Sequence, residues 1–167
     1  MCSTLDNFFK IAVFAVGIFI IWGWGNSLEV RADSDEKNLK NCLAGTYLIE
    51  EGSGTRGLWE FSKDGNFTGT SSAQPLLNFS TLQGMWKPNG KRTAKAIVLD
   101  FSFDDQENLI NIARVDILVR GEGKKCQKVE GEFSLRFFEE GEDPLQVETD
   151  AGEPFMDLFT GQRITAN

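Results

Sequence analysis

The feature that most constrains the fold is a repeated two-residue alternation of apolar and polar side chains, interrupted by turn-forming residues. Residues 128–138 show it most clearly, because Val129, Phe133 and Leu135 alternate with charged or hydroxyl-bearing residues. Successive side chains of a strand point to opposite faces, so this pattern predicts a strand with one dry face and one wet face. From Leu43 onward no stretch shows a sustained 3.6-residue apolar period. The chain is therefore predicted to be all-β after residue 42.

Eight segments have the properties of strands, and most of the connections between them are short. The dipeptide Asp64-Gly65 is a strong hairpin signal, because glycine readily adopts the positive φ of a tight turn. Such brief connections join antiparallel neighbours. The expected strands are residues 43–50, 55–62, 66–72, 79–87, 93–103, 109–120, 128–138 and 155–164.

Pairing the last strand with the first would remove every unpaired sheet edge. We therefore expect an eight-stranded antiparallel up-and-down β-barrel over residues 43–167. A two-sheet sandwich is the alternative. An eight-stranded barrel is filled by its own side chains or is just wide enough for one small ligand.

The first 32 residues have a different character. No charged residue occurs from Ile11 to Leu28, Lys10 supplies a positive flank, and Val30-Arg31-Ala32 resembles a signal-peptidase site. We expect a signal peptide over residues 1–32, with an uncleaved membrane anchor as the alternative. Residues 33–42 are a polar N-terminal segment with room for one or two helical turns. The barrel is accordingly expected to be secreted or periplasmic, touching a membrane only through an uncleaved anchor.

Cys42 and Cys126 would be the two cysteines left after cleavage. Thiols oxidise outside the cytoplasm, so a disulfide between them is expected. Two buried free thiols are the alternative.

Charge and composition exclude several classes of function. The chain has 25 acidic and 17 basic residues, a net charge of −8, and no histidine. Nucleic-acid binding requires clustered basic residues and is not expected. The absence of histidine removes the commonest general base and the histidine-containing metal sites. The acidic turn Asp104-Asp105-Gln106-Glu107 lacks the spaced ligands and central glycine of an EF-hand. No catalytic residue, cofactor or metal site is predicted.

Two short motifs resemble those of calycin barrels, the group that contains lipocalins and avidins. Leu43-Ala44-Gly45-Thr46-Tyr47 resembles their Gly-x-aromatic first strand, and Gly65-Asn66-Phe67-Thr68-Gly69-Thr70 resembles the third strand of avidins, with Cys42 placed as in some of them. The resemblance implies a small exported calycin-like barrel. It does not extend to the biotin site, because Ser71 stands where avidins have a tyrosine and no tryptophan occurs late in the chain.

Aromatic side chains are the candidates for ligand binding, because they offer a large contact area at low entropic cost. They can equally fill the barrel. Glycines on inward faces, Gly84 and Gly131, would leave space there or mark a bend. The candidate ligand-binding residues are Tyr47, Trp59, Trp86, Phe101 and Phe103.

The sequence thus favours an exported, non-catalytic binding protein for a small apolar molecule, which requires an interior pocket of at least about 300 Å³. A protein–protein interaction module of the cell envelope is one alternative, with an outer apolar patch around Leu58, Val98 and Leu118. A barrel-type isomerase or cyclase-like enzyme is another. Its weakly indicated candidates are Asp100 or Asp116, with Arg114 as electrostatic partner, and it predicts an interior carboxylate with a raised pKa.

Overall fold

The computed structural model describes residues 37–146 and 153–166. The predicted signal peptide, residues 1–32, lies outside this part of the chain. No helix within the described residues is long and apolar enough to cross a membrane.

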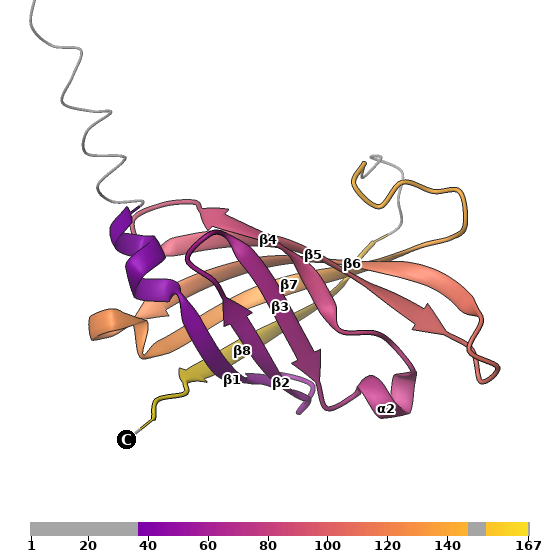
Figure 1. Cartoon of the computed structure of the whole chain (residues 1–167), viewed down its shortest axis with the longest axis horizontal. Helices are drawn as coiled ribbons and strands as arrows, with labels where there is room; N and C mark the ends of the chain where they lie inside the picture. The colour runs from indigo at the N-terminus through magenta and orange to yellow at the C-terminus, as the bar shows by residue number, and fades with distance from the viewer. Residues whose placement is uncertain (1–36, 147–152, 167) are drawn as a thin grey trace, which may run out of the picture.

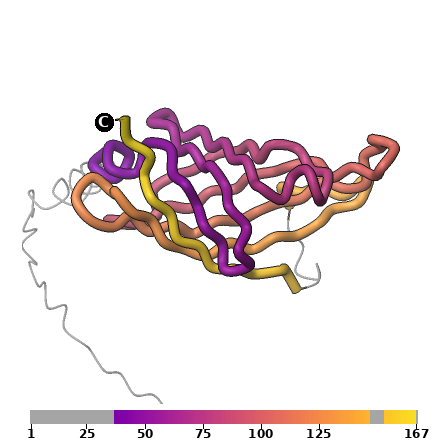
Figure 2. The backbone as a smooth tube through the Cα atoms, turned by 90° about the horizontal axis from the view of Figure 1, so that it is seen from below, coloured from indigo at the N-terminus to yellow at the C-terminus, as the bar shows by residue number. Residues whose placement is uncertain are grey.

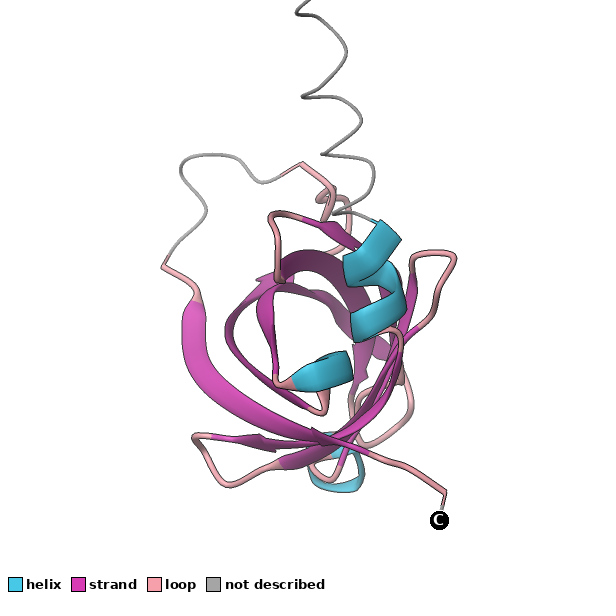
Figure 3. Ribbon diagram, turned by 90° about the vertical axis from the view of Figure 1, so that its left-hand side faces the viewer, coloured by secondary structure: helices cyan, strands magenta, loops and turns pink. Residues whose placement is uncertain are grey.

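Eight antiparallel strands form a closed barrel in sequence order, which confirms the predicted fold class (Figures 1 and 3). Each strand pairs with the next, and β8 returns to β1 with Tyr47 opposite Arg163 and Glu51 opposite Phe159. Closure leaves no sheet edge unpaired. The strands are β1 (Gly45–Glu51), β2 (Arg56–Phe61), β3 (Asn66–Ser71), β4 (Leu82–Pro88), β5 (Thr93–Phe103), β6 (Leu109–Glu122), β7 (Lys128–Phe138) and β8 (Phe155–Arg163).

Two strands begin two or more residues later than predicted. Residues 37–43 are helical, so Leu43 ends a helix and β1 starts at Gly45. The short helix α2 (Gln74–Leu77) and an irregular segment precede β4, and Phe79 makes only an isolated bridge to Ser102. Pro75 in the first turn of α2 and Asn78 in the left-handed conformation explain why this segment leaves the sheet. A short 3₁₀ helix, η1 (Lys124–Cys126), connects β6 to β7.

The inward face of β5 is the reverse of the one expected from residue size. Ala94, Ala96, Val98 and Asp100 are buried inside, whereas Phe101 is 46% exposed on the outer wall. Both faces of this strand carry apolar residues, so alternation alone does not select one. The inner face takes the small side chains because bulky aromatic residues from neighbouring strands already occupy the barrel.

Those aromatic residues form a continuous plug inside the barrel. Phe61 packs edge-on against Tyr47, Phe67 and Trp86, with ring centroids 5.0–6.0 Å apart. Phe67 in turn contacts Trp59 at 5.6 Å, and Trp59 contacts Phe159 at 4.7 Å. Such pairs add about 0.5–1.5 kcal/mol each beyond the burial of area. This chain of rings fills one part of the barrel completely.

The two inward glycines mark close strand approach rather than empty space. A Cβ at Gly84 would lie 2.0 Å from the Ile97 carbonyl oxygen, and one at Gly131 would lie 2.1 Å from the Leu118 carbonyl oxygen. Only glycine allows the backbones to come this near. Neither position lines the pocket inside the barrel.

Candidate functional site: a pocket at the open end of the barrel

The two ends of the barrel differ in what covers them. The helix over residues 37–43, the β6–β7 turn and the end of β8 gather at one end (Figure 2), which we call the closed end. Leu39 and Leu43 of that helix are buried against the aromatic plug. The predicted disulfide is present there and joins Cys42 of the helix to Cys126 of η1, with Cα atoms 5.3 Å apart.

At the closed end, no buried side-chain nitrogen or oxygen of the described residues lacks a hydrogen-bond partner. The Tyr47 hydroxyl lies 3.0 Å from the Leu43 carbonyl oxygen and 2.9 Å from that of Cys126. The Arg163 guanidinium donates to the Ala44 carbonyl at 2.6 Å and to the carbonyls of Cys126 and Cys42, and it lies over the Tyr47 ring. These bonds fasten the end of the chain to its beginning.

The opposite end, which we call the open end, contains a pocket of about 530 Å³ inside the barrel. Trp59 forms its floor, because this ring lines the pocket and also packs against the plug. Leu82, Ala113, Val115, Phe133 and Leu135 provide apolar walls. The volume lies within the usual range for small-molecule sites, and the lining is mostly apolar, as is typical of them.

The mouth of this pocket is also apolar. Leu77 of α2, Phe137 of β7 and Phe155 of β8 line it, and all three side chains are more than half exposed. Phe79 completes the rim. Exposed apolar side chains gathered at a cavity entrance indicate a binding surface more strongly than the same side chains scattered singly.

Three polar side chains lie on one wall of the pocket, on the neighbouring strands β5 and β6. Asp100 and Ser102 are two residues apart on the inner face of β5, and Asn111 lies directly opposite Ser102 on β6. Asp100 is 6% exposed, and burial raises the pKa of its carboxyl to about 6. The Oδ1 atom of Asn111 is buried and accepts no hydrogen bond from any described residue. Buried acceptors without a donor are costly and rare in native proteins.

A second carboxylate, Glu51, lines the pocket from β1. Burial raises its pKa, and the nearby carboxylate of Asp157 raises it further. Asp157 itself accepts a hydrogen bond from the Ser53 backbone at 2.9 Å, and such backbone hydrogen bonds lower its pKa. The pocket is therefore electrostatically negative when these groups are ionised.

Of the residues considered for an enzyme, Arg114 and Asp116 are brought together, but neither lines the pocket or faces Asp100. Arg114 and Asp116 project from the outer face of β6 and form a two-pronged ion pair with N–O distances of 2.8 and 2.9 Å. The Pro144 carbonyl accepts a third hydrogen bond from Arg114 at 2.9 Å. This pair attaches the segment after β7 to the barrel wall and plays no part in the pocket.

Of the aromatic candidates, the structure places Trp59 alone in the pocket wall. Tyr47 and Trp86 belong to the plug, where the Trp86 indole donates to the Ser62 carbonyl at 2.8 Å. Phe101 faces outward, and Phe103 lies at a register shift near the end of β5 without lining the pocket. The outer patch expected around Leu58, Val98 and Leu118 does not form, because Val98 is buried inside the barrel.

Sequence reasoning missed most of the pocket. Leu82, Phe133 and Leu135 have the correct alternation for inward positions, but nothing in the alternation tells which part of each strand lies beyond the plug. Asn111 is the signal that was available: a polar residue in phase with the apolar residues Ala113, Val115 and Ile117 marks an inward face that ends in a polar site.

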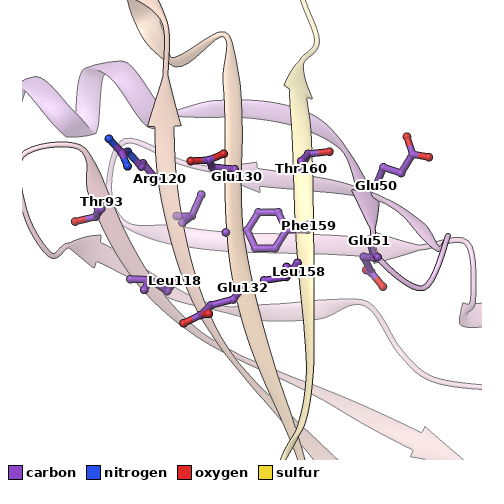
Figure 4. A pocket seen from close by; sticks show the side chains of 13 residues that line it. Glu50, Glu51, Thr93, Leu118, Arg120, Glu130, Glu132, Leu158, Phe159 and Thr160 are labelled. Atoms are coloured by element: carbon purple, nitrogen blue, oxygen red, sulfur yellow. The ribbon is translucent and has the colours of Figure 1, made fainter.

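A second concavity, of about 640 Å³, lies on the outer wall over β6, β7 and β8 (Figure 4). Arg120, Glu130 and Thr160 stand side by side across it, with Glu132 and Leu158 below. This concavity is more open to solvent than the interior pocket, so a small molecule bound there would keep more of its surface in water. The interior pocket is the better candidate site.

Fold and site together define a closed antiparallel barrel with a plugged end and a pocketed end. The sequence matches no protein-family model and no curated protein. Among solved structures, that of EF1p2_mFAP2b bound to DFHBI is similar, with 12% identity, a TM-score of 0.46, and a match covering 77% of this chain and 99% of that chain. A likeness at this level carries no inference about the ligand of this chain.

Proposed function

We propose that this protein is an exported, non-catalytic binding protein that holds one small, largely apolar molecule in the pocket at the open end of its barrel. The observation that carries the proposal is the pocket itself: about 530 Å³ enclosed by a barrel whose other end is tightly plugged. A rigid, preformed cavity binds without a large ordering cost, which favours affinity.

The composition of the pocket supports an apolar ligand. Burial of apolar surface contributes about 25 cal/mol per Å², and Trp59, Leu82, Phe133 and Leu135 all present such surface. The exposed ring of Phe155 and the exposed Leu77 side chain at the rim would be covered by a bound molecule. A binding function therefore accounts for the apolar side chains at the mouth of the pocket.

Export is proposed on separate grounds. The apolar segment before Asn26 is followed by Val30-Arg31-Ala32, a signal-peptidase pattern. A disulfide between Cys42 and Cys126 suits an oxidising compartment, and the calycin-like motifs at Gly45 and Gly65 suit a small secreted barrel. We place the protein in the periplasm or outside the cell.

An isomerase or cyclase-like activity is the second candidate, and Asp100 is the observation that favours it. A buried carboxyl group with a raised pKa in a cavity has the properties of a general acid or base. The two candidates differ in one result: a binding protein returns its ligand unchanged, whereas an enzyme releases a molecule of altered structure.

The test is native mass spectrometry of the protein purified from its own host, followed by extraction and mass measurement of any retained molecule. We expect a single added mass in the range of small organic molecules. The variant Ala113→Phe, which fills the pocket from β6, should lose this mass. Thr68→Phe, which adds the same ring to the exposed outer face of β3, is the matched control and should retain it. Retention of the molecule by Ala113→Phe, or no retained molecule together with no binding of neutral aromatic probes, would refute the proposal.

A further inference from the structure

We propose that the pocket selects ligands that carry an amine or ammonium group, which the acceptor wall formed by Asp100, Ser102 and Asn111 binds. This inference rests on the proposed function and adds the chemical class of the ligand to it. Three features of the pocket support it: the placement of these side chains, the lack of hydrogen-bond partners for Asp100 and Asn111 among the described residues, and the charge of the lining.

The first observation concerns Asp100. Its carboxylate is inside the barrel and lines the pocket, yet it forms no hydrogen bond or ion pair with another described residue. Burying a carboxylate without a partner is expensive, and proteins normally compensate it with a cation or several donors. A donor supplied by the ligand would satisfy Asp100 where the protein does not.

The second observation is independent and concerns Asn111. Its buried Oδ1 atom has no hydrogen-bond donor among the described residues, and Asn111 lines the same pocket. Asp100 and Asn111 are diagonal neighbours across β5 and β6, because Asp100 pairs with Ala113 and Ser102 pairs with Asn111. Diagonal neighbours are about 7–8 Å apart between Cα atoms, so one small polar group can reach both side chains. Ser102 adds a third oxygen, two residues from Asp100 on β5 and opposite Asn111 on β6.

The third observation is the sign of the charge. Two carboxylates, those of Asp100 and Glu51, line the pocket, and no lysine or arginine does so among the described lining residues. A fatty acid or another carboxylate ligand would therefore meet like charges inside a poorly screened cavity. An ammonium group would meet two carboxylates and, on the acceptor wall, the amide and hydroxyl oxygens of Asn111 and Ser102. The ring of Trp59 and the phenyl rings of Phe133 and Phe155 also favour a cation beside them.

The arrangement of polar and apolar surface in the pocket indicates the overall form of the ligand. The acceptor wall occupies one side of the pocket, whereas Trp59, Leu82, Phe133 and Leu135 offer apolar contact elsewhere. A suitable ligand thus has an apolar, preferably aromatic body and one nitrogen donor. Its body would fill the space above Trp59 while the nitrogen faces β5 and β6.

Three probes of nearly equal shape test the inference: 1-naphthylmethylamine, 1-naphthylacetic acid and neutral 1-methylnaphthalene. Binding is measured by isothermal titration calorimetry at pH 8, where the Asp100 carboxyl is ionised and the amine is protonated. We expect the amine to bind about tenfold or more tightly than the neutral probe, as one charged hydrogen bond provides. The carboxylate should bind more weakly than the neutral probe.

Two variants test whether Asp100 and Asn111 cause the preference for the amine over the neutral probe. Asp100→Asn should reduce amine affinity about tenfold and leave the neutral probe unchanged, and Asn111→Leu should reduce amine affinity by a smaller factor. Glu132→Gln removes an exposed carboxylate from the outer face of β7 and is the matched control for net charge; it should change neither affinity. At pH 5 the amine preference should shrink, because Asp100 becomes protonated below its pKa of about 6 and Glu51, the other titratable group lining the pocket, also has a raised pKa.

The outcomes separate the two proposals. Equal affinity for the amine and the neutral probe, or an amine preference that survives Asp100→Asn, would overturn this inference and leave the binding function intact. Tighter binding of the carboxylate would also overturn it. Failure of all three probes to bind would count against the binding function itself.

Discussion

The two ends of this barrel use buried polar groups in opposite ways. At the closed end the Arg163 guanidinium and the Tyr47 hydroxyl contact backbone carbonyls of Cys42, Ala44 and Cys126. At the open end the Asp100 carboxylate and Asn111 Oδ1 have no protein partner among the described residues. At the closed end the polar groups therefore stabilise the fold through hydrogen bonds within the protein. At the open end they can form hydrogen bonds with a ligand. Two buried side-chain atoms of the described residues lack a hydrogen bond: Asn111 Oδ1 lies in the pocket, whereas Arg136 Nε of β7 does not line it. An acceptor without a donor inside a pocket indicates a site that a ligand can complete.

Apolar packing shows the same division. The closed end is filled by interlocked rings, whereas at the open end rings such as Phe137 and Phe155 stand more than half exposed around a cavity. Stability should thus come mainly from the closed end. Binding should come mainly from the open end.

The largest expected difference between the ends is in core truncation. Phe61→Ala removes a fully buried ring that contacts Tyr47, Phe67 and Trp86, and should cost about 3–5 kcal/mol of unfolding free energy. Phe155→Ala removes a ring that is 55% exposed and should cost less than about 1 kcal/mol. Denaturant unfolding of both variants measures the two costs. Similar costs would mean that the barrel has no stabilising end.

The disulfide provides the next largest effect. Cys126→Ser opens a bridge between residues 84 apart in sequence and should reduce stability by about 2–4 kcal/mol. Probe affinity at the open end should stay within about twofold, because the bridge lies at the closed end. Thermal unfolding and calorimetric titration check the two statements. An unchanged melting temperature under oxidising conditions would show that the bridge does not stabilise the fold.

The smallest effect concerns Asp100 and depends on pH. Its pKa is about 6 in the folded protein against an ordinary value of 3.8, so the folded state holds this proton more tightly than the unfolded state. Stability from this group is therefore fully present below about pH 4 and is lost as the pH rises to about 6. Asp100→Asn should stabilise the empty protein by about 1–2 kcal/mol at pH 8, a value reduced for the hydration of an open pocket.

The measurement is the difference in unfolding free energy between Asp100→Asn and wild type at pH 4 and at pH 8. We expect almost no difference at pH 4. If Asp100→Asn is less stable than wild type at pH 8, then Asp100 forms a stabilising interaction within the protein and its carboxylate is not free to bind a ligand.

The sequence predicted the barrel well because its signals are local. Alternation located all eight strands, and turn residues such as Gly65 located the hairpins. The closure of β8 on β1 followed from the need to pair sheet edges. The two late strand starts depended on Pro75, Asn78 and the extent of the N-terminal helix, which compete with strand propensity over a few residues.

The pocket was harder to predict because it depends on long-range packing. Trp59 and Trp86 are similar in sequence context, yet one forms the pocket floor and the other lies in the plug. Their difference is set by distance along the barrel axis, which alternation does not encode. Phe101 shows a second limit of alternation, because β5 is apolar on both faces and the pattern does not tell which face points inward. The bulk of residues on other strands determines the inner face. The signal peptide over residues 1–32 stays a prediction.

If ligands bind only at the open end of the barrel, the two buried tryptophans should respond differently to a ligand. Their indole N–H signals can be followed in two-dimensional ¹H–¹⁵N NMR, with Trp59→Phe and Trp86→Phe used for assignment and 1-methylnaphthalene as the titrant. We predict that the Trp59 signal shifts progressively to saturation, whereas the Trp86 signal, whose indole is bonded to the Ser62 carbonyl, stays in place. A Trp86 shift as large as that of Trp59, or saturating binding that leaves Trp59 unmoved, would contradict the account.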